Sequence, residues 1–167
     1  MNPATPAITI RPIQPGDNTA LAQIIRTSLE EFGAAKPGTV YFDATTDALF
    51  QLFQRDGAAY FVSEAAGVLL GGGGIYPTAG LPQGTCEFVK MYLRAESRGL
   101  GLGKKLIEQN LAFAKAFGYS QVYLETMPEL RAALRVYEKF GFQYLKQPLG
   151  NSGHHGCSLW MLKELNA

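Results

Sequence analysis

A stretch rich in glycine, SRGLGLGKKLIE at residues 97–108, places three glycines at every second position between two different structural patterns. The segment before it, TCEFVKMYL at 85–93, is typical of a strand. Apolar residues then recur at helical spacing over 102–117. A second strand pattern follows at 120–126. The order strand, helix, strand predicts two parallel strands joined by a right-handed crossover.

Strand and helix patterns also mix through the rest of the chain. Strands are predicted at 8–13, 59–65, 68–77, 142–145 and 157–165, and helices at 17–32, 45–56 and 128–140. This mixture predicts an α/β or α+β fold built on a mixed sheet.

Composition excludes several classes of protein. The 167 residues carry 15 basic and 14 acidic side chains, and a balance so close to neutral argues against nucleic-acid binding. No apolar run reaches the roughly 18 residues of a membrane span. The segment MNPATPAITIRP lacks the layout of a signal peptide, and the two cysteines form no CxxC pair. We therefore expect one domain, residues 1–167, in the reducing cytoplasm.

Bare backbone directly before a helix predicts a binding site for an anion, above all a phosphate. Unpaired N–H groups and the positive end of the helix dipole meet there, and glycine lets a ligand approach the main chain. Two well-known phosphate loops do not fit. A P-loop would need glycine at Arg98 and a hydroxyl at Lys105, and the dinucleotide pattern would need glycine at Leu106.

The pattern that does fit is R-x-x-G-x-G, from Arg98 to Gly103. Here the sequence resembles the GNAT superfamily of acyl-CoA-dependent N-acyltransferases, whose coenzyme A pyrophosphate loop has this pattern. RVYEKFGFQYL (135–145) is similar to that superfamily's fourth helix and next strand, and ITIRPIQPGDNTAL (8–21) to its first strand and helix. The resemblance implies a mixed, mostly antiparallel sheet of about seven strands flanked by about four helices. It also implies acetyl-CoA as cosubstrate, a homodimer, and an acceptor that is a small amine, an amino acid or a peptide N-terminus.

The resemblance also assigns residues to the coenzyme. The loop residues Arg98, Gly99, Leu100, Gly101, Leu102, Gly103 and Lys104 would hold the pyrophosphate. The strand residues Met91, Tyr92 and Leu93 would pair with the pantetheine arm and bind the thioester carbonyl. One position departs from the family, because Leu130 stands where many members have an asparagine that binds this arm.

Acetyl transfer to an amine needs a base for the ammonium proton and an acid for the departing thiolate. Glu87, a carboxylate within an apolar strand, is the candidate base; a structural carboxylate is the open alternative. Two-residue periodicity places it on the same strand face as residues 89, 91 and 93 unless a bulge intervenes. Tyr137 matches the tyrosine that the family uses as the acid, and core packing is its alternative.

Other features concern the acceptor. Phe32, Tyr41 and Phe42 lie where the family builds its acceptor pocket, and His155 is a loop histidine that could face it. No metal site is predicted, because the His154–Cys157 cluster has no second ligand pair at suitable spacing. A non-catalytic acyl-CoA-binding or regulatory module of the same fold remains the alternative to an enzyme.

Overall fold

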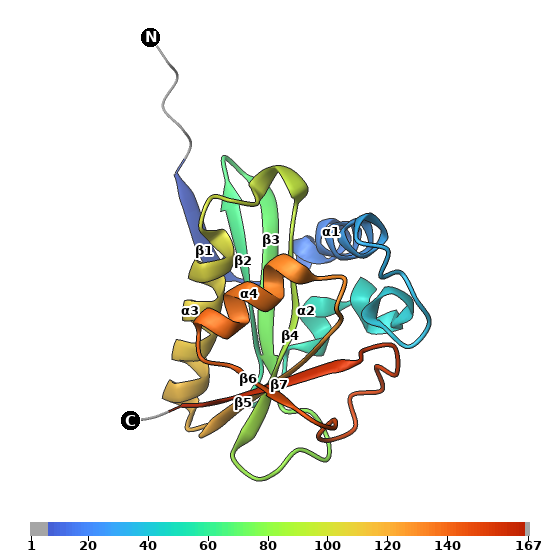
Figure 1. Ribbon diagram of the computed structural model, residues 1–167. Helices are drawn as coiled ribbons and strands as arrows, with labels where there is room; N and C mark the ends of the chain where they lie inside the picture. The colour runs from blue at the N-terminus through green and yellow to red at the C-terminus, as the bar shows by residue number, and fades with distance from the viewer. Residues whose placement is uncertain (1–6, 166–167) are drawn as a thin grey trace.

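The computed structural model describes residues 7–165, which form one seven-stranded sheet with helices on both faces (Figure 1). The strand order is β1-β2-β3-β4-β5-β7-β6, and every neighbouring pair is antiparallel except the parallel pair β4 and β5. The strands are β1 (Ile8–Pro12), β2 (Ala59–Ala65), β3 (Val68–Tyr76), β4 (Thr85–Leu93), β5 (Gln121–Thr126), β6 (Gln143–Leu145) and β7 (Leu159–Glu164). The α-helices are α1 (Asn18–Glu31), α2 (Leu49–Leu52), α3 (Leu102–Phe117) and α4 (Arg131–Lys139). The predicted fold class and the parallel crossover are confirmed.

Two predicted helices are shorter than expected. The pattern at 45–56 yields a 3-10 turn and the single turn of α2, because Thr46 donates its hydroxyl hydrogen to the carbonyl oxygen of Val40 (2.7 Å) and Ala48 leaves helical backbone angles. Helix α4 begins only at Arg131, so Pro128 lies before the helix rather than in its first turn.

Helices cover the sheet on both sides, and each side has its own apolar core. The first core joins α1 and α2 to the sheet and contains Leu21, Ile25, Leu49 and Val62. The second lies under α3 and α4, which Figure 1 shows in front of the sheet, and contains Ile107, Val122, Tyr137 and Met161. None of the helices within residues 7–165 is both long enough and apolar enough to cross a bilayer.

The run of four glycines at 71–74 lies within β3 and makes room for aromatic rings. A Cβ atom on Gly72 would lie 2.5 Å from a ring carbon of Tyr60, and one on Gly74 would lie 2.7 Å from ring carbons of Phe53 and Tyr60. Tyr60 can therefore lie flat against the strand, and its hydroxyl donates to the carbonyl oxygen of Lys90 on β4 (2.8 Å). The glycines thus allow the buried Tyr60 to hydrogen-bond to one point of the neighbouring strand, at Lys90.

That point is a β-bulge. Val89 pairs with Gly74 and Tyr92 with Gly72, so Lys90 and Met91 together face the single residue Gly73. Lys90 takes left-handed backbone angles (φ 55°), which few residues other than glycine adopt. The extra residue reverses the alternation of side chains along β4.

As a result, residues on either side of the bulge change faces. Glu87, paired with Tyr76, and Val89 lie on the α1 side of the sheet, whereas Met91 and Leu93 approach Gly103 of α3 on the other side. Residues 87, 89, 91 and 93 therefore do not share one face, because the bulge that could interrupt the alternation is present after Val89.

Strand β4 also separates from β5 halfway along its length. Pairing between them covers only Thr85 to Glu87 on β4, opposite Gln121 to Tyr123 on β5. Beyond this point β5 remains paired with β7 as far as Thr126. Within the part of the chain that the structure describes, residues 88–93 of β4 thus have a strand partner on one side only, and Glu87 lies where the two strands divide.

Candidate active site

A cavity of about 350 Å³ occupies the space between the diverging strands. Its walls come from residues 87–93 of β4, residues 124–127 at the end of β5, the first turn of α3, and one face of α4. The end of α1 contributes Ser28 and Phe32. One cavity therefore connects the glycine loop with the two candidate catalytic residues.

The start of α3 has the backbone geometry that the glycines predict. Gly99 and Gly101 both have positive φ angles, 80° and 77°, and Gly101 is the N-cap residue of the helix. A Cβ atom at Gly103 would be in van der Waals contact with Cε of Met91 (3.4 Å), so the glycine leaves space open beside Met91. The unpaired N–H groups of this first turn are available to an anion. The loop residues predicted to bind the coenzyme line the cavity, except Leu100, which is 58% exposed.

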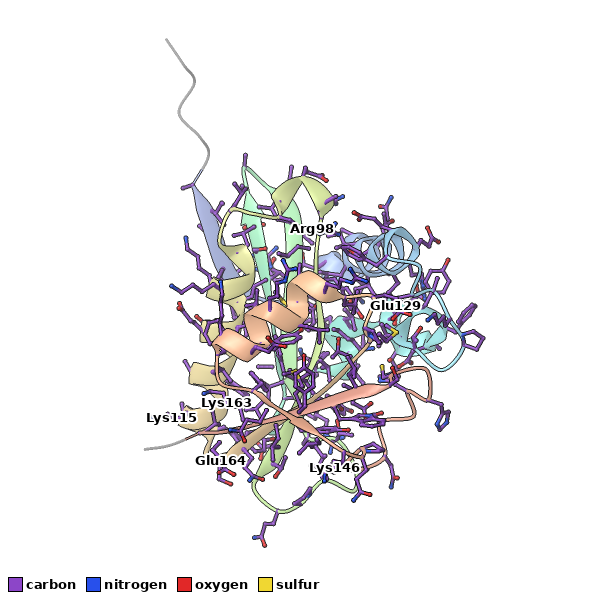
Figure 2. The ribbon with its side chains drawn as sticks, in the orientation of Figure 1. Arg98, Lys115, Glu129, Lys146, Lys163 and Glu164 are labelled. Carbon is purple, nitrogen blue, oxygen red and sulfur yellow. The ribbon has the colours of Figure 1, made fainter. Side chains whose placement is uncertain are left out.

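Arg98 leaves this loop toward α1 (Figure 2). Its Nη1 atom donates to Glu31 (2.6 Å), its Nη2 atom donates to the carbonyl oxygen of Leu93 (3.1 Å), and its guanidinium lies 4.7 Å from the centre of the Phe32 ring. The ion pair with Arg98 holds the pKa of Glu31 below its ordinary value. Arg98 thus ties the loop to the end of α1 beside the cavity.

Glu87 is buried at the point where β4 and β5 divide, with 3% of its surface exposed. Its carboxylate accepts a hydrogen bond from the hydroxyl of Thr78 (2.6 Å). Burial raises the pKa of Glu87 to about 7, and the nearby carboxylate of Glu125 acts in the same direction, against the Thr78 hydrogen bond and the charge of Lys90. A carboxylate with this pKa can accept or release a proton near neutral pH.

Tyr137 faces the cavity from α4, on the other side of the sheet. Its ring packs edge-on against Phe88 and Phe142, with centroid distances of 6.1 and 5.8 Å. Burial raises the pKa of Tyr137 above its ordinary value, so the phenol keeps its proton at neutral pH. The core-packing alternative and the acid role are both compatible with this position.

Three further polar residues, which the sequence did not single out together, meet at the end of the cavity where Glu87 lies. Lys90 is 8% exposed, and its Nζ atom lies 3.6 Å from Oδ2 of Asp43. His154 brings its Nε2 atom within 3.2 Å of the same oxygen. Hydrogen bonds from Thr45, together with Lys90 and His154, lower the pKa of Asp43 to about 2 in spite of its partial burial. No local sequence signal indicates this cluster, because its members come from three distant segments.

The predicted acceptor residues differ in their positions. Phe32 lines the cavity, but Tyr41 turns its hydroxyl to Glu30, and Phe42 is 62% exposed. His155 lies outside the cavity, in a neighbouring hollow near Trp160, whereas its neighbour His154 lines both. Of the two histidines, the structure therefore brings His154 to the candidate site.

One group among the described residues has the side-chain types of a metal site. Ligand-type atoms of Glu87, Glu125 and His154 lie within 4.8 Å of one another. Each side chain already has a protein partner: Thr78 for Glu87, Tyr123 (2.6 Å) and Ser152 for Glu125, and Asp43 for His154. The same atoms could also surround a protonated amine.

Comparison with known proteins agrees with this geometry. Residues 21–142 match the Acetyltransferase (GNAT) family. This chain belongs to the GNAT family. An uncharacterised N-acetyltransferase of Escherichia coli K12, YjgM, is 40% identical over 150 residues, which cover 89% of this chain and 90% of the relative.

Solved structures of GNAT proteins share the fold. An acetyltransferase of the GNAT family from Staphylococcus aureus Mu50 superposes with a TM-score of 0.85 at 18% identity, covering 96% of this chain and all of the other (100%). The PaiA N-acetyltransferase of Thermoplasma acidophilum, solved in complex with coenzyme A, superposes with a TM-score of 0.74 at 18% identity, covering 95% and 99%. The resemblance seen in the sequence is confirmed at the level of family and fold.

Proposed function

We propose that this GNAT protein is an N-acetyltransferase that transfers an acetyl group from acetyl-CoA directly to a primary amine in a ternary complex. The observation that carries the proposal is the single cavity, which runs from the first turn of α3 to Glu87 and also reaches Tyr137. A coenzyme anion, a thioester and an amine need such a continuous space, because the amine must reach the thioester carbonyl.

The loop supplies the groups that fit the pyrophosphate of acetyl-CoA. Free N–H groups at the start of α3 and the helix dipole favour a dianion, and Lys104 adds positive charge at the rim. The unpaired side of β4 at 91–93 offers backbone groups to the pantetheine arm. Leu130 lines the same cavity, so apolar contact takes the place of the asparagine found in many relatives.

Glu87 and Tyr137 divide the proton transfers between them. Glu87 takes a proton from the incoming ammonium group, and a backbone N–H of β4 donates to the carbonyl oxygen as it becomes an oxyanion. The C–N bond forms, the C–S bond breaks, and Tyr137 gives its proton to the sulfur. The nitrogen then loses its second proton, which restores the phenol of Tyr137, and Glu87 releases the first proton to solvent.

A panel of amines tests the proposal. Purified protein is incubated with acetyl-CoA and each amine, and the free thiol and the mass of the acceptor are both measured. We expect thiol release that depends on the amine and a matching increase in acceptor mass. Binding of coenzyme A with neither signal for any amine would instead support the non-catalytic acyl-CoA-binding module.

A further inference from the structure

Lys90 is a buried cation with too few partners. Its side chain lines the cavity, yet its Nζ atom makes no hydrogen bond to any group within residues 7–165. The nearest anion, Asp43 Oδ2, is 3.6 Å away and already shared with His154. Burying an ammonium group without hydrogen-bond acceptors is costly, so this geometry favours an anionic group that enters the cavity.

The opposite charge lies on the same wall of the cavity. Glu87 and Glu125 bring carboxylate oxygens to within 4.8 Å of each other and of His154, and Glu87 and Lys90 are close enough to influence each other's pKa. This end of the cavity therefore presents two carboxylates next to one ammonium group. A ligand that matches it carries a positive and a negative charge a short distance apart.

We propose that the acceptor is a free α-amino acid, whose ammonium group lies against Glu87 and Glu125 and whose carboxylate binds Nζ of Lys90. This inference rests on the proposed acetyl transfer and specifies its substrate. Because the Cα atom separates the two charged groups of an α-amino acid, one small molecule provides both contacts. Its side chain meets the apolar wall formed by Val40, Met127 and Leu130.

The other acceptor classes match less well. A simple amine leaves Nζ of Lys90 without a hydrogen-bonded anion, and a peptide N-terminus offers a neutral amide where the carboxylate would bind. A divalent metal held by Glu87, Glu125 and His154 would bring a cation without a carboxylate for Lys90, whereas an α-amino acid brings both charges.

Matched compounds test the carboxylate requirement without any mutation. The standard α-amino acids are surveyed first. Then kcat/KM is compared for L-leucine and two analogues, L-leucinamide and 3-methylbutylamine, which keep the side chain of leucine but lack its negative charge. We expect the amino acid to exceed both analogues by about 10- to 100-fold, the value of a hydrogen bond to a charged group. Equal values, or faster amines, would overturn the amino-acid assignment and leave the acetyltransferase proposal intact. Absence of thiol release with these compounds and with every member of the amine panel would instead overturn the acetyltransferase proposal.

The variant Lys90→Met tests the residue itself. We expect KM for L-leucine to rise at least tenfold, the preference for L-leucine over L-leucinamide to disappear, and the Kd for acetyl-CoA to stay within about twofold. Lys115→Met, at an exposed position in the last turn of α3 and labelled in Figure 2, is the matched control and should behave as wild type.

Two results would contradict the role of Lys90. A folded Lys90→Met variant that retains the preference for the amino acid would remove Lys90 from the site. Loss of wild-type activity in a chelator, with recovery on adding a divalent metal, would assign Glu87, Glu125 and His154 to a metal instead. If Lys90→Met does not fold, the comparison of the three compounds on the wild-type protein alone decides whether the acceptor is an α-amino acid.

Discussion

Glu87 and Tyr137 reach the cavity from opposite faces of the sheet, and each is buried in a way that suits a different proton transfer. Burial raises the pKa of both groups. For the carboxyl this brings the pKa to about 7, where the group can accept a proton and release it again. For the phenol it protects the proton, so that Tyr137 can act only as a donor at neutral pH.

Replacing Glu87 by glutamine should remove the base and keep the hydrogen bond with Thr78, because the amide oxygen can still accept it. We expect kcat to fall by about 10²- to 10⁴-fold, and the limb near pH 7 of the wild-type kcat/KM–pH profile, which reports the free enzyme, to disappear. Steady-state kinetics from pH 5.5 to 9 measures both. Glu164→Gln, at an exposed position on β7, serves as the control, and an unchanged pH profile in Glu87→Gln would leave Glu87 as a structural carboxylate.

Tyr137→Phe tests the acid. The substitution keeps the ring that packs against Phe88 and Phe142, so stability and the Kd for acetyl-CoA should change little. We expect kcat to fall by about tenfold or more, and the loss to shrink with an acyl donor whose thiol has a lower pKa. Full turnover of the natural thioester by the variant would assign Tyr137 to packing alone.

At the scale of elements, the start of α3 and the bulge in β4 set the geometry of the cavity, and they differ in how easily sequence reveals them. The glycine loop was predictable because its signal is local: alternate glycines stand between a strand pattern and a helix pattern. The bulge at Lys90 was not, because it depends on Tyr60, which reaches Lys90 only through space cleared by the glycines of β3. Alternation of apolar residues therefore described β4 up to Val89 and failed beyond it.

The same distinction applies to the candidate site. Glu87 and Tyr137 lie in segments with a recognisable pattern, so both could be named from the sequence. Asp43, Lys90 and His154 could not be named, since an ion pair between distant segments produces no pattern in the sequence of either segment. The choice between His154 and His155 likewise depends on the path of the loop before β7, which the sequence pattern does not determine.

Gly103→Val tests the role of the helix start as an anion site. The branched side chain would extend past Met91 into the space where the pyrophosphate should bind, and we expect the Kd for acetyl-CoA to rise at least tenfold. Stability should change by less than about 1 kcal/mol, because valine has a somewhat better helix propensity than glycine. Ala116→Val, on the exposed side of α3, is the control. Calorimetry that gives wild-type affinity for a folded Gly103→Val variant would remove the phosphate-loop interpretation.

At the scale of the whole molecule, the cavity separates two cores. The core beside α1 and the core beneath α3 and α4 lie on opposite faces of the sheet, and the two faces are connected where β4 and β5 separate. Two ion pairs join the α1 side to the loops before α3 and α4: Arg98 with Glu31 at the end of α1, and Lys36 with Glu129 (2.5 Å). Figure 2 labels Arg98 and Glu129. A ligand in the cavity touches both sides and should therefore stabilise the molecule as a unit.

Coenzyme A should raise the Tm of the wild-type protein. At a concentration of about 100 times Kd, a ligand that binds only the folded state adds roughly 2.7 kcal/mol, which corresponds to about 5–10 °C for a chain of this size. Differential scanning calorimetry measures the shift, and the weaker binding of Gly103→Val should reduce it at the same concentration. An identical shift in both proteins would place the coenzyme elsewhere.

The buried carboxyl of Glu87 should also make the stability of the molecule depend on pH. Its pKa is about 7 in the folded chain and near the ordinary 4.5 in the unfolded chain. Between these values the folded state holds a proton that the unfolded state has lost, so the free energy of unfolding falls as pH rises from 4.5 to 7 and then levels off. A difference of this size corresponds to roughly 3 kcal/mol. Asp43 does not contribute in this window, because its pKa lies at about 2 when folded and 3.8 when unfolded.

Glu87→Gln isolates this effect, because glutamine does not titrate. Urea denaturation at pH 5 and at pH 8 gives the free energy of unfolding of both proteins. We expect the stability of wild type relative to the variant to drop by roughly 3 kcal/mol between the two conditions, so that Glu87→Gln gains on wild type at high pH. Glu164→Gln should differ from wild type by the same amount at both pH values. A difference between wild type and Glu87→Gln that does not vary with pH would mean that Glu87 titrates normally in the folded protein, and its assignment as a base active near pH 7 would then fail.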